Sequence, residues 1–216
     1  MLGLLKKRSI DKETLNRALE EVDFVVVDTE LTGLNSRKDS IVSIGAIRME
    51  GSRILLGDVF YRVVAPSTVN SAAVVVHEIT PDETSLCPEL NLVLPEFLYF
   101  IKDRVIVGHH IDLDISFINR ALKSSGKKPL ENPAVDTYKI YTYLKRKKIE
   151  ADAFFEPAKA PESLFEIAGT YDISVQNVHH ALYDAFVTAQ LFQRFIHELK
   201  LRGVKTLKDL LIIGSI

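Results

Sequence analysis

The spacing of apolar and polar residues along the chain predicts a mixed α/β domain. Residues 24–29 (FVVVDT) form a continuous β-branched run, which is typical of a central strand that is covered on both faces. Two further apolar runs, residues 40–49 and 54–64, follow after the turn residues 35–39 and 51–52. Three strands with such short connections favour an antiparallel meander.

After the meander the pattern changes to helices that alternate with short strands. Apolar residues at helical spacing predict a helix from Leu90 to Ile101, in which Pro95 must lie in the first turn or cause a kink. Further expected elements are a strand at 104–108, a helix at 115–123, a strand at 134–136, a helix to about Leu144, an exposed loop at 145–160, and helices at 163–171, 181–200 and 205–213.

A segment with helical spacing, Asp11 to Glu21, precedes the first strand, and Asp11 is its expected N-cap. We therefore divide the chain into an N-terminal extension with one helix (1–22), a main domain (23–200), and a short C-terminal helix with a tail (201–216). The two terminal segments can pack on the domain or on a second copy, so the pattern leaves the oligomeric state open.

Composition and charge narrow the function further. The 216 residues carry a formal net charge of −2, which excludes binding of nucleic acid by bulk positive charge. The single cysteine, Cys87, forms no intramolecular disulfide, and no apolar run approaches the roughly 20 residues of a membrane span. We therefore expect a cytoplasmic protein without membrane contact, which grips any polyanion locally or through bound cations.

Candidate chemistry begins with Asp28 and Glu30 at the end of the first strand. Side chains at i and i+2 of a strand share a face, so both carboxylates project together. A divalent cation offsets their repulsion. For such a pair viewed alone, however, a strand that simply ends in polar residues is the better interpretation.

Two further clusters contain acids and histidines. Asp114 lies at the start of a predicted helix, where capping is an alternative to a role in the site, and Asp112 is a competitor two residues away. In the third cluster, a continuous helix would place His180 on the same face as Asp184, whereas His179 reaches Asp184 only from a preceding loop.

Together, the three clusters resemble the three exonuclease motifs of the DEDD superfamily. The histidine-to-aspartate spacing is that of its histidine-bearing branch, and the resemblance is greatest to the epsilon-type proofreading exonucleases of bacterial DNA polymerase III and their stand-alone relatives. It covers roughly Asp23 to Phe195 and is carried by DTELTGL (28–34), VHEIT (76–80), VGHHIDLDISFI (107–118), DTY (136–138) and HHALYDAFVTAQLF (179–192). The chain departs from the usual motifs at Leu31, Glu78, His110 and Leu113.

The resemblance implies a ribonuclease H-like fold and two-metal hydrolysis that removes nucleotides from 3′ ends. Asp28 would bridge two Mg²⁺ or Mn²⁺ ions, Glu30 and Asp184 would complete the site of the attacking water, and Asp114 would support the second ion. His179 would take the proton from the water, because imidazole changes charge near neutral pH. We choose His179 over His180 on the family's spacing.

The same resemblance implies a pocket for the terminal nucleotide. Leu34, His77 and Ile79 would pack on its base or sugar, and Phe117 would help to shape the wall, although core packing is an equal alternative for Leu34 and the better one for Phe117. The full set of predicted substrate-binding residues is Leu31, Thr32, Gly33, Leu34, His77, Ile79, His109 and His110.

The expected partner is a nucleic acid with a free 3′ end, preferentially single-stranded DNA. An RNA-trimming exoribonuclease is the alternative within the enzyme class, and a non-catalytic nucleic-acid or polymerase-binding module is the alternative outside it. A DNA polymerase subunit is a further candidate partner. We favour a free-standing enzyme, because few residues follow Phe195.

Overall fold

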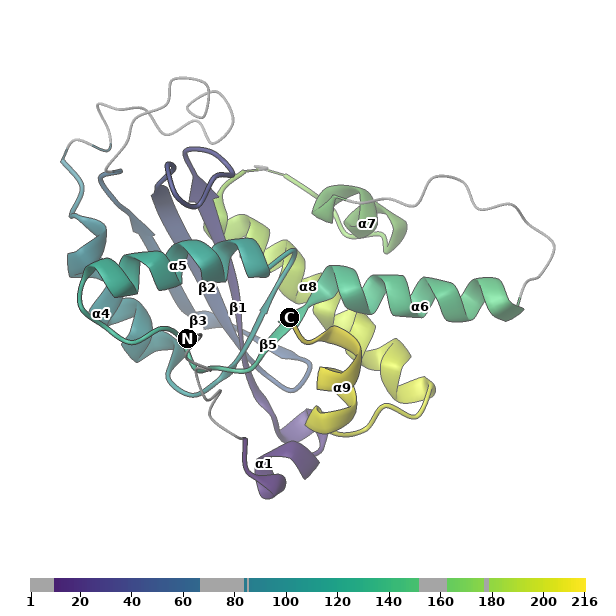
Figure 1. The fold of residues 1–216 in the computed structure, drawn as a ribbon. Coiled ribbons are helices and arrows are strands. Elements are labelled where there is room, and N and C mark those ends of the chain that lie inside the picture. The colour runs from purple at the N-terminus through teal and green to yellow at the C-terminus, as the bar shows by residue number, and fades with distance from the viewer. Residues whose placement is uncertain (1–9, 67–83, 85, 152–162, 177–178) are drawn as a thin grey trace.

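A five-stranded mixed sheet forms the centre of the molecule, which we describe from a computed structural model (Figure 1). The structure describes residues 10–66, 84, 86–151, 163–176 and 179–216, and for residues 147–151 it describes the backbone only. The strands lie in the order β3-β2-β1-β4-β5. The first three are antiparallel neighbours, and β4 and β5 continue the sheet parallel to β1, as the sequence predicts for this fold class.

The strands lie close to their predicted positions because their β-branched runs suit a sheet that is buried on both faces. The central strand β1 is almost wholly buried along its apolar part. The strands are β1 (Asp23–Leu31), β2 (Ile41–Glu50), β3 (Arg53–Val63), β4 (Val105–Gly108) and β5 (Ala134–Asp136).

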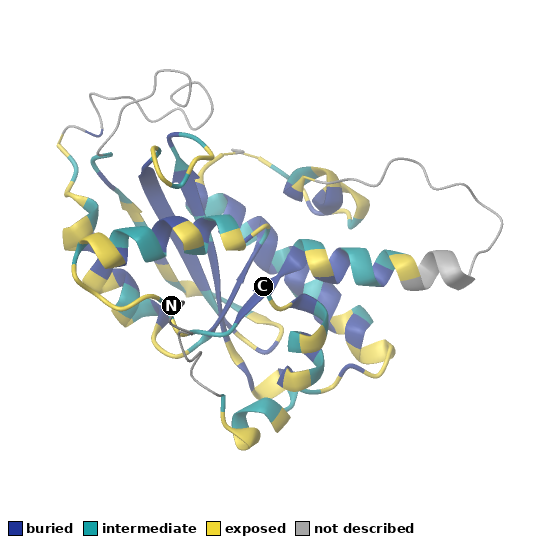
Figure 2. Ribbon diagram, in the orientation of Figure 1, coloured by how far each residue is buried: buried dark blue, intermediate teal, exposed yellow. Residues whose placement is uncertain are grey.

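Helices cover both faces of the sheet and enclose two apolar clusters (Figure 2). Alternate residues of β1 divide between them: Phe24 and Val26 join the cluster under α6 and α8, whereas Val25 and Val27 join the cluster under α4 and α5. The helices of these two layers are α4 (Leu90–Ile101), α5 (Asp112–Ser124), α6 (Thr137–Ala151), α7 (Leu164–Thr170), α8 (Ala181–Leu201) and α9 (Leu207–Gly214). No helix in the described parts of the chain is both long and apolar enough to span a membrane.

The N-terminal segment differs from the single predicted helix. Asp11 caps the short helix α1 (Lys12–Asn16), but the chain then becomes extended before a single 3-10 turn, η1 (Leu19–Glu21). The helix stops because Ala18 pairs with Thr206 of the C-terminal segment. Both terminal segments thus pack on the domain itself, with Leu19 fully buried beneath them.

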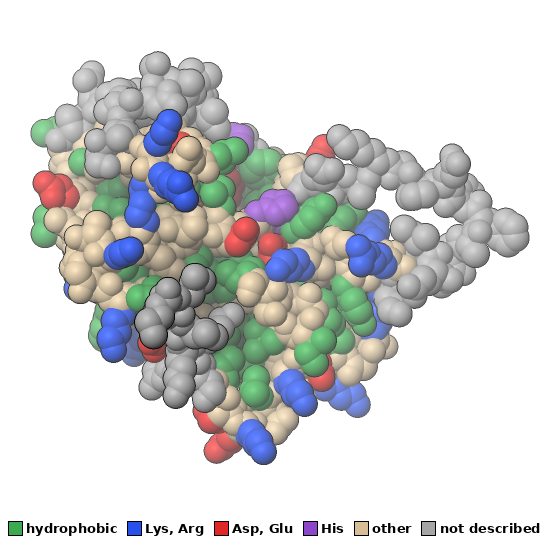
Figure 3. All heavy atoms as spheres, viewed as in Figure 1, with side chains coloured by type: hydrophobic (Ala, Val, Ile, Leu, Met, Phe, Trp, Pro, Cys, Tyr) green, Lys and Arg blue, Asp and Glu red, His purple; other side chains and the backbone are tan. Residues whose placement is uncertain are grey.

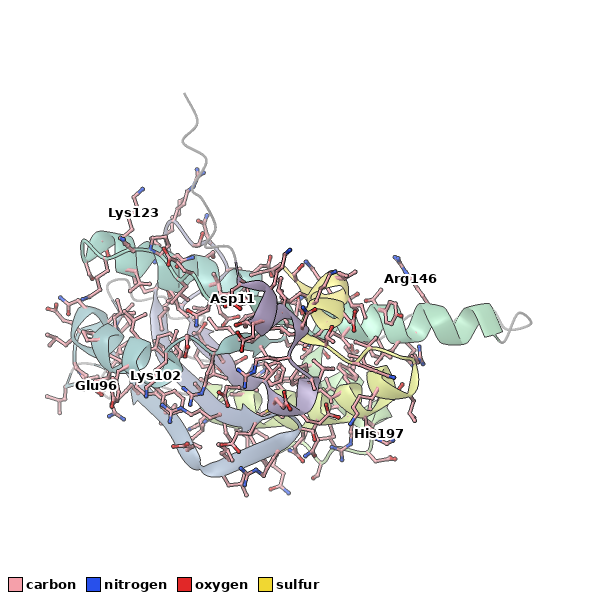
Figure 4. The ribbon with its side chains drawn as sticks, turned by 90° about the horizontal axis from the view of Figure 1, so that it is seen from below. Asp11, Glu96, Lys102, Lys123, Arg146 and His197 are labelled. Carbon is pink, nitrogen blue, oxygen red and sulfur yellow. The ribbon has the colours of Figure 1, made fainter. Side chains whose placement is uncertain are left out.

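Two helices also differ from their predicted course. The predicted loop at 145–160 is wrong in its first part, because α6 continues to Ala151: lysine and arginine favour a helix, and no breaker occurs before Pro157. Figure 4 shows Arg146 of this helix projecting away from the ribbon. In α4, Pro95 lies beyond the first turn, in the interior of a helix that continues on both sides of it.

Candidate active site

Asp28 and Glu30 lie at the carboxyl end of β1 and project from the same face of the sheet. They continue the alternation that begins with Phe24 and Val26, so they point toward α8 rather than α5. Glu30 is buried, and Asp28 is partly buried. The two-residue spacing therefore places both carboxylates on one face of the sheet, as the sequence predicts.

The third acid of this group, Asp184, comes from the first turn of α8. One carboxylate oxygen from each of Asp28, Glu30 and Asp184 lies within 4.8 Å of the other two. The backbone N–H of His179 donates to Asp184 Oδ2 at 3.1 Å, while Asp184 Oδ1 is buried and has no hydrogen-bond partner among the described residues. A buried carboxylate oxygen without a donor is a position that suits a cation.

Asp114 enters the site from the opposite layer, on the first turn of α5. Its Oδ1 accepts a hydrogen bond from the backbone N–H of Thr29 at 2.9 Å and another from the Thr29 hydroxyl. Asp114 is the third residue of the helix, and Ile111 occupies the N-cap position, so capping does not explain the aspartate. The competitor Asp112 is exposed. Sequence reasoning missed Thr29, whose place between two predicted metal ligands was the available signal.

The electrostatics show how costly this arrangement is for ionised acids. Burial, followed by the charges of Asp114, Asp184 and Glu30, raises the pKa of Asp28 well above its ordinary range. Burial is also the main cause that raises the pKa of Glu30, Asp114 and Asp184, each to about 7. The hydrogen bonds from Thr29 and His179 act in the opposite direction on Asp114 and Asp184. A cation bound between these carboxylates would offset their burial and mutual repulsion.

The two histidines of the third motif precede α8 instead of lying on it. His180 is the N-cap residue, so the continuous helix that favoured His180 beside Asp184 does not exist. Its ring stacks on Tyr61 of β3, with ring centroids 4.5 Å apart. His180 thus contacts the outer edge of the sheet.

His179 lies on the loop that precedes α8, the position from which it was expected to approach Asp184. It has a left-handed backbone conformation with φ of 64°. Its side chain is exposed, and its ring meets Phe165 of α7 edge to face at 5.6 Å. The backbone bond to Asp184 ties this loop to the acids, whereas the imidazole stays accessible.

The predicted nucleotide-binding residues Leu31 to Leu34 lie at the end of β1 and in the loop that connects β1 to β2. Buried Thr32 joins the two ends of this loop: its backbone N–H donates to the Ser40 carbonyl, and its hydroxyl accepts from the Ser40 backbone N–H. Asp39 fills the space beside Gly33. Leu34 is 79% exposed, so core packing does not explain this leucine. Half-buried Leu31 packs against the cluster under α4 and α5.

The other predicted pocket residues divide by location. Phe117 is fully buried in the core, as its alternative interpretation held. His109 bonds the Thr137 hydroxyl through Nδ1 at 3.0 Å, and the exposed His110 lies next to Tyr138, with its backbone N–H donating to Asp136. His77 and Ile79 lie outside the described residues.

Figure 3 shows acidic and histidine side chains side by side near the middle of the face where α5 and α8 approach β1. The mixed sheet order and its flanking helices define a ribonuclease H-like fold, and the acids at the end of its central strand are of the kind that can hold divalent cations for phosphodiester hydrolysis. A sequence profile of the family described as "Exonuclease" (RNase_T) matches residues 25–192. The chain belongs to this exonuclease family, and the prediction of a 3′–5′ exonuclease is confirmed.

Individual relatives agree with this family. The epsilon subunit of DNA polymerase III from Aquifex aeolicus (strain VF5) is 34% identical over 179 residues, which cover 82% of this chain and 81% of the relative. Two solved structures share the fold at lower identity. Exonuclease I of E. coli with a dT13 oligonucleotide has a TM-score of 0.71 at 15% identity, and the match covers 85% of this chain but only 43% of that one. Exonuclease X with 5′ overhanging duplex DNA has a TM-score of 0.64 at 20% identity, over 88% and 99% of the two chains.

Proposed function

We propose that this enzyme releases nucleoside monophosphates from the 3′ ends of single-stranded or frayed DNA by metal-dependent hydrolysis. The observation that carries the proposal is the group of three carboxylates, Asp28, Glu30 and Asp184, whose oxygen atoms lie within 4.8 Å of one another. Their raised pKa values and the unpartnered Asp184 oxygen support a site that is completed by cations.

The residues present fit two Mg²⁺ or Mn²⁺ ions, since these ions prefer carboxylate oxygen atoms. Asp28, Glu30 and Asp184 would hold one ion, and Asp28 with Asp114 would hold the other. Such an ion pair stabilises charge on the attacking and leaving oxygen atoms of a phosphodiester. It also explains how a chain with a net charge of −2 binds a polyanion.

In this proposal His179 removes the proton from the attacking water. Its exposed imidazole on a loop supports this role, because a general base must reach the water from the substrate side of the acids. The His179 N–H bond keeps the loop beside Asp184. Thr29 orients Asp114 through its two hydrogen bonds.

The loop from Leu31 to Leu34 would receive the terminal nucleotide. The exposed Leu34 side chain offers an apolar surface to a base, and the bonds between Thr32 and Ser40 hold the loop in place. Exposed His110 would line the approach to the site together with His109. A polymerase partner, which the printed name of the epsilon relative suggests, stays a prediction for this chain.

Digestion of matched oligonucleotides tests the substrate class. Single- and double-stranded DNA and RNA of one sequence, each with a 5′ label, are incubated with the enzyme and Mg²⁺ or Mn²⁺. We expect single-stranded DNA to shorten fastest. Faster digestion of RNA would assign the enzyme to RNA trimming, and binding of every oligonucleotide without cleavage would identify a non-catalytic module.

A further inference from the structure

The start of α8 lies directly on a row of residues that crosses three strands. Asp28 of β1 pairs with Gly45 of β2, and Gly45 pairs with Tyr61 of β3. A Cβ atom at Gly45 would lie 2.2 Å from the carbonyl carbon of Ala181 and from the backbone nitrogen of Leu182. The helix backbone therefore rests on the strand backbone, and any other residue at position 45 must push the helix away.

This close approach brings Asp184 to the other acids. Asp184 lies in the same helical turn as Ala181, and its carboxylate reaches those of Asp28 and Glu30. Because the clash at Gly45 is with the backbone of α8, no change of side-chain rotamer can relieve it. A displacement at this position moves the whole turn that carries Asp184.

Tyr61, the cross-strand partner of Gly45, contacts the residue that caps the same turn. Its ring stacks on that of His180, with an interplanar angle of 23°, and His180 Nδ1 in turn accepts a hydrogen bond from the Tyr183 backbone N–H at 3.4 Å. Two contacts thus set the position of the N-terminus of α8: its backbone lies directly against Gly45, which has no side chain, and its N-cap residue His180 stacks on Tyr61.

We propose that Gly45 and Tyr61 are positioning residues that set the distance of Asp184 from Asp28 and Glu30. The expected effect on kcat rests on the proposed function, whereas the expected effect on Mn²⁺ affinity does not. Ordinary van der Waals contact begins at 3.4 Å, so a methyl group at position 45 requires a shift of about 1.2 Å. A misplacement of about 1 Å in an active site costs on the order of 10²-fold in rate.

The test compares Gly45→Ala and Tyr61→Ala with two controls. Gly57→Ala on β3 is the matched control, because a Cβ atom there meets nothing within 4 Å. Tyr61→Phe keeps the ring that stacks on His180. For each full-length variant, Mn²⁺ affinity is measured without substrate by titration calorimetry, and kcat and KM are measured on a 5′-labelled single-stranded DNA. Thermal melting in EDTA reports the fold.

We expect Gly45→Ala to weaken Mn²⁺ binding at least tenfold and to lower kcat about 10²-fold, with KM nearly unchanged because the loop at 31–34 is untouched. Tyr61→Ala should lower kcat by roughly 3- to 10-fold, the scale of one lost aromatic pair, and Tyr61→Phe should restore it. Gly57→Ala should resemble the wild type in every measurement.

A cooperatively melting Gly45→Ala variant with wild-type Mn²⁺ affinity would overturn the proposal for Gly45. If Gly45→Ala does not melt cooperatively, Tyr61→Ala decides: lowered Mn²⁺ affinity that Tyr61→Phe restores supports positioning, and unchanged affinity overturns it. A wild-type enzyme that binds Mn²⁺ but digests no nucleic acid would contradict the proposed function alone, since the affinities still test the positions of the acids.

Discussion

Replacement of Glu30 by glutamine isolates the electrostatic cost of the acid site. Burial and the charges of Asp184 and Asp114 raise the pKa of Glu30 from 4.5 to about 7 in the folded protein. The folded state therefore binds more protons than the unfolded state between these values, and stability falls as the pH rises through this window. Below about pH 4.5 the cost is absent, and above pH 7 it is complete.

The magnitude follows from the pKa difference. A gap of about 2.5 pKa units corresponds to about 3 kcal/mol of unfolding free energy that the ionised Glu30 costs at pH 8. Glutamine has nearly the same shape and no charge, so Glu30→Gln should raise the melting temperature in EDTA by about 6–12 °C at pH 8. At pH 5 most of this gain should disappear, because the wild-type side chain is then largely protonated.

Calorimetry of both proteins in EDTA, from pH 5 to pH 8, measures this dependence. Glu131→Gln is the control, because Glu131 is exposed and lies outside the site. Mn²⁺ at 100 times its Kd should narrow the difference at pH 8, since the metal then stabilises the wild type by about 2.7 kcal/mol and the variant by less. A lower melting temperature for Glu30→Gln at pH 8 in EDTA, or a gain that is equal at pH 5, would refute this reasoning.

Three further predictions concern the other site residues. Asp28→Ala should abolish turnover and raise the melting temperature in metal-free buffer, because it removes repulsion among the unliganded acids; retained turnover would remove Asp28 from the site. Asp112→Ala should keep most activity whereas Asp114→Ala should lose it, and equal losses would show that the second motif is misaligned. His179→Ala should lower kcat by roughly 10²–10⁴-fold at unchanged Mn²⁺ affinity, and His180→Ala should cost much less; the opposite order in steady-state kinetics would show that the motif register is wrong.

The central sheet and the shared face of Asp28 and Glu30 could be predicted from sequence because both depend on local patterns, whereas Asp114 and Asp184 joined the group only through the resemblance to the exonuclease motifs. The β-branched run of β1 ends in Asp28 and Glu30, and strand alternation alone places them on one face. The choice between His179 and His180 was harder. It depends on where α8 begins: His180 caps the helix, and its ring stacks on Tyr61 of a strand that is distant in the sequence.

Contacts between distant segments explain what the sequence did not reveal. Ala18 leaves the helical pattern of its segment to pair with Thr206, and Gly45 contacts a helix 136 residues later in the chain. The one local signal was an isolated glycine within a strand pattern, which indicates that another backbone approaches closely but not which one. Thr29 lies between Asp28 and Glu30 in the sequence, but its bond to Asp114, 85 residues later in the chain, has no local signal.

The most direct test of the central claim is digestion of a 5′-labelled single-stranded DNA by wild type and Asp28→Ala, with Mn²⁺, with Mg²⁺ or with EDTA. The wild type with metal should give a ladder that shortens from the 3′ end, with nucleoside monophosphates as the released product. EDTA and Asp28→Ala should each leave the DNA intact, and added Mn²⁺ should restore only the wild type. Undiminished hydrolysis in EDTA, or by Asp28→Ala, would contradict the account.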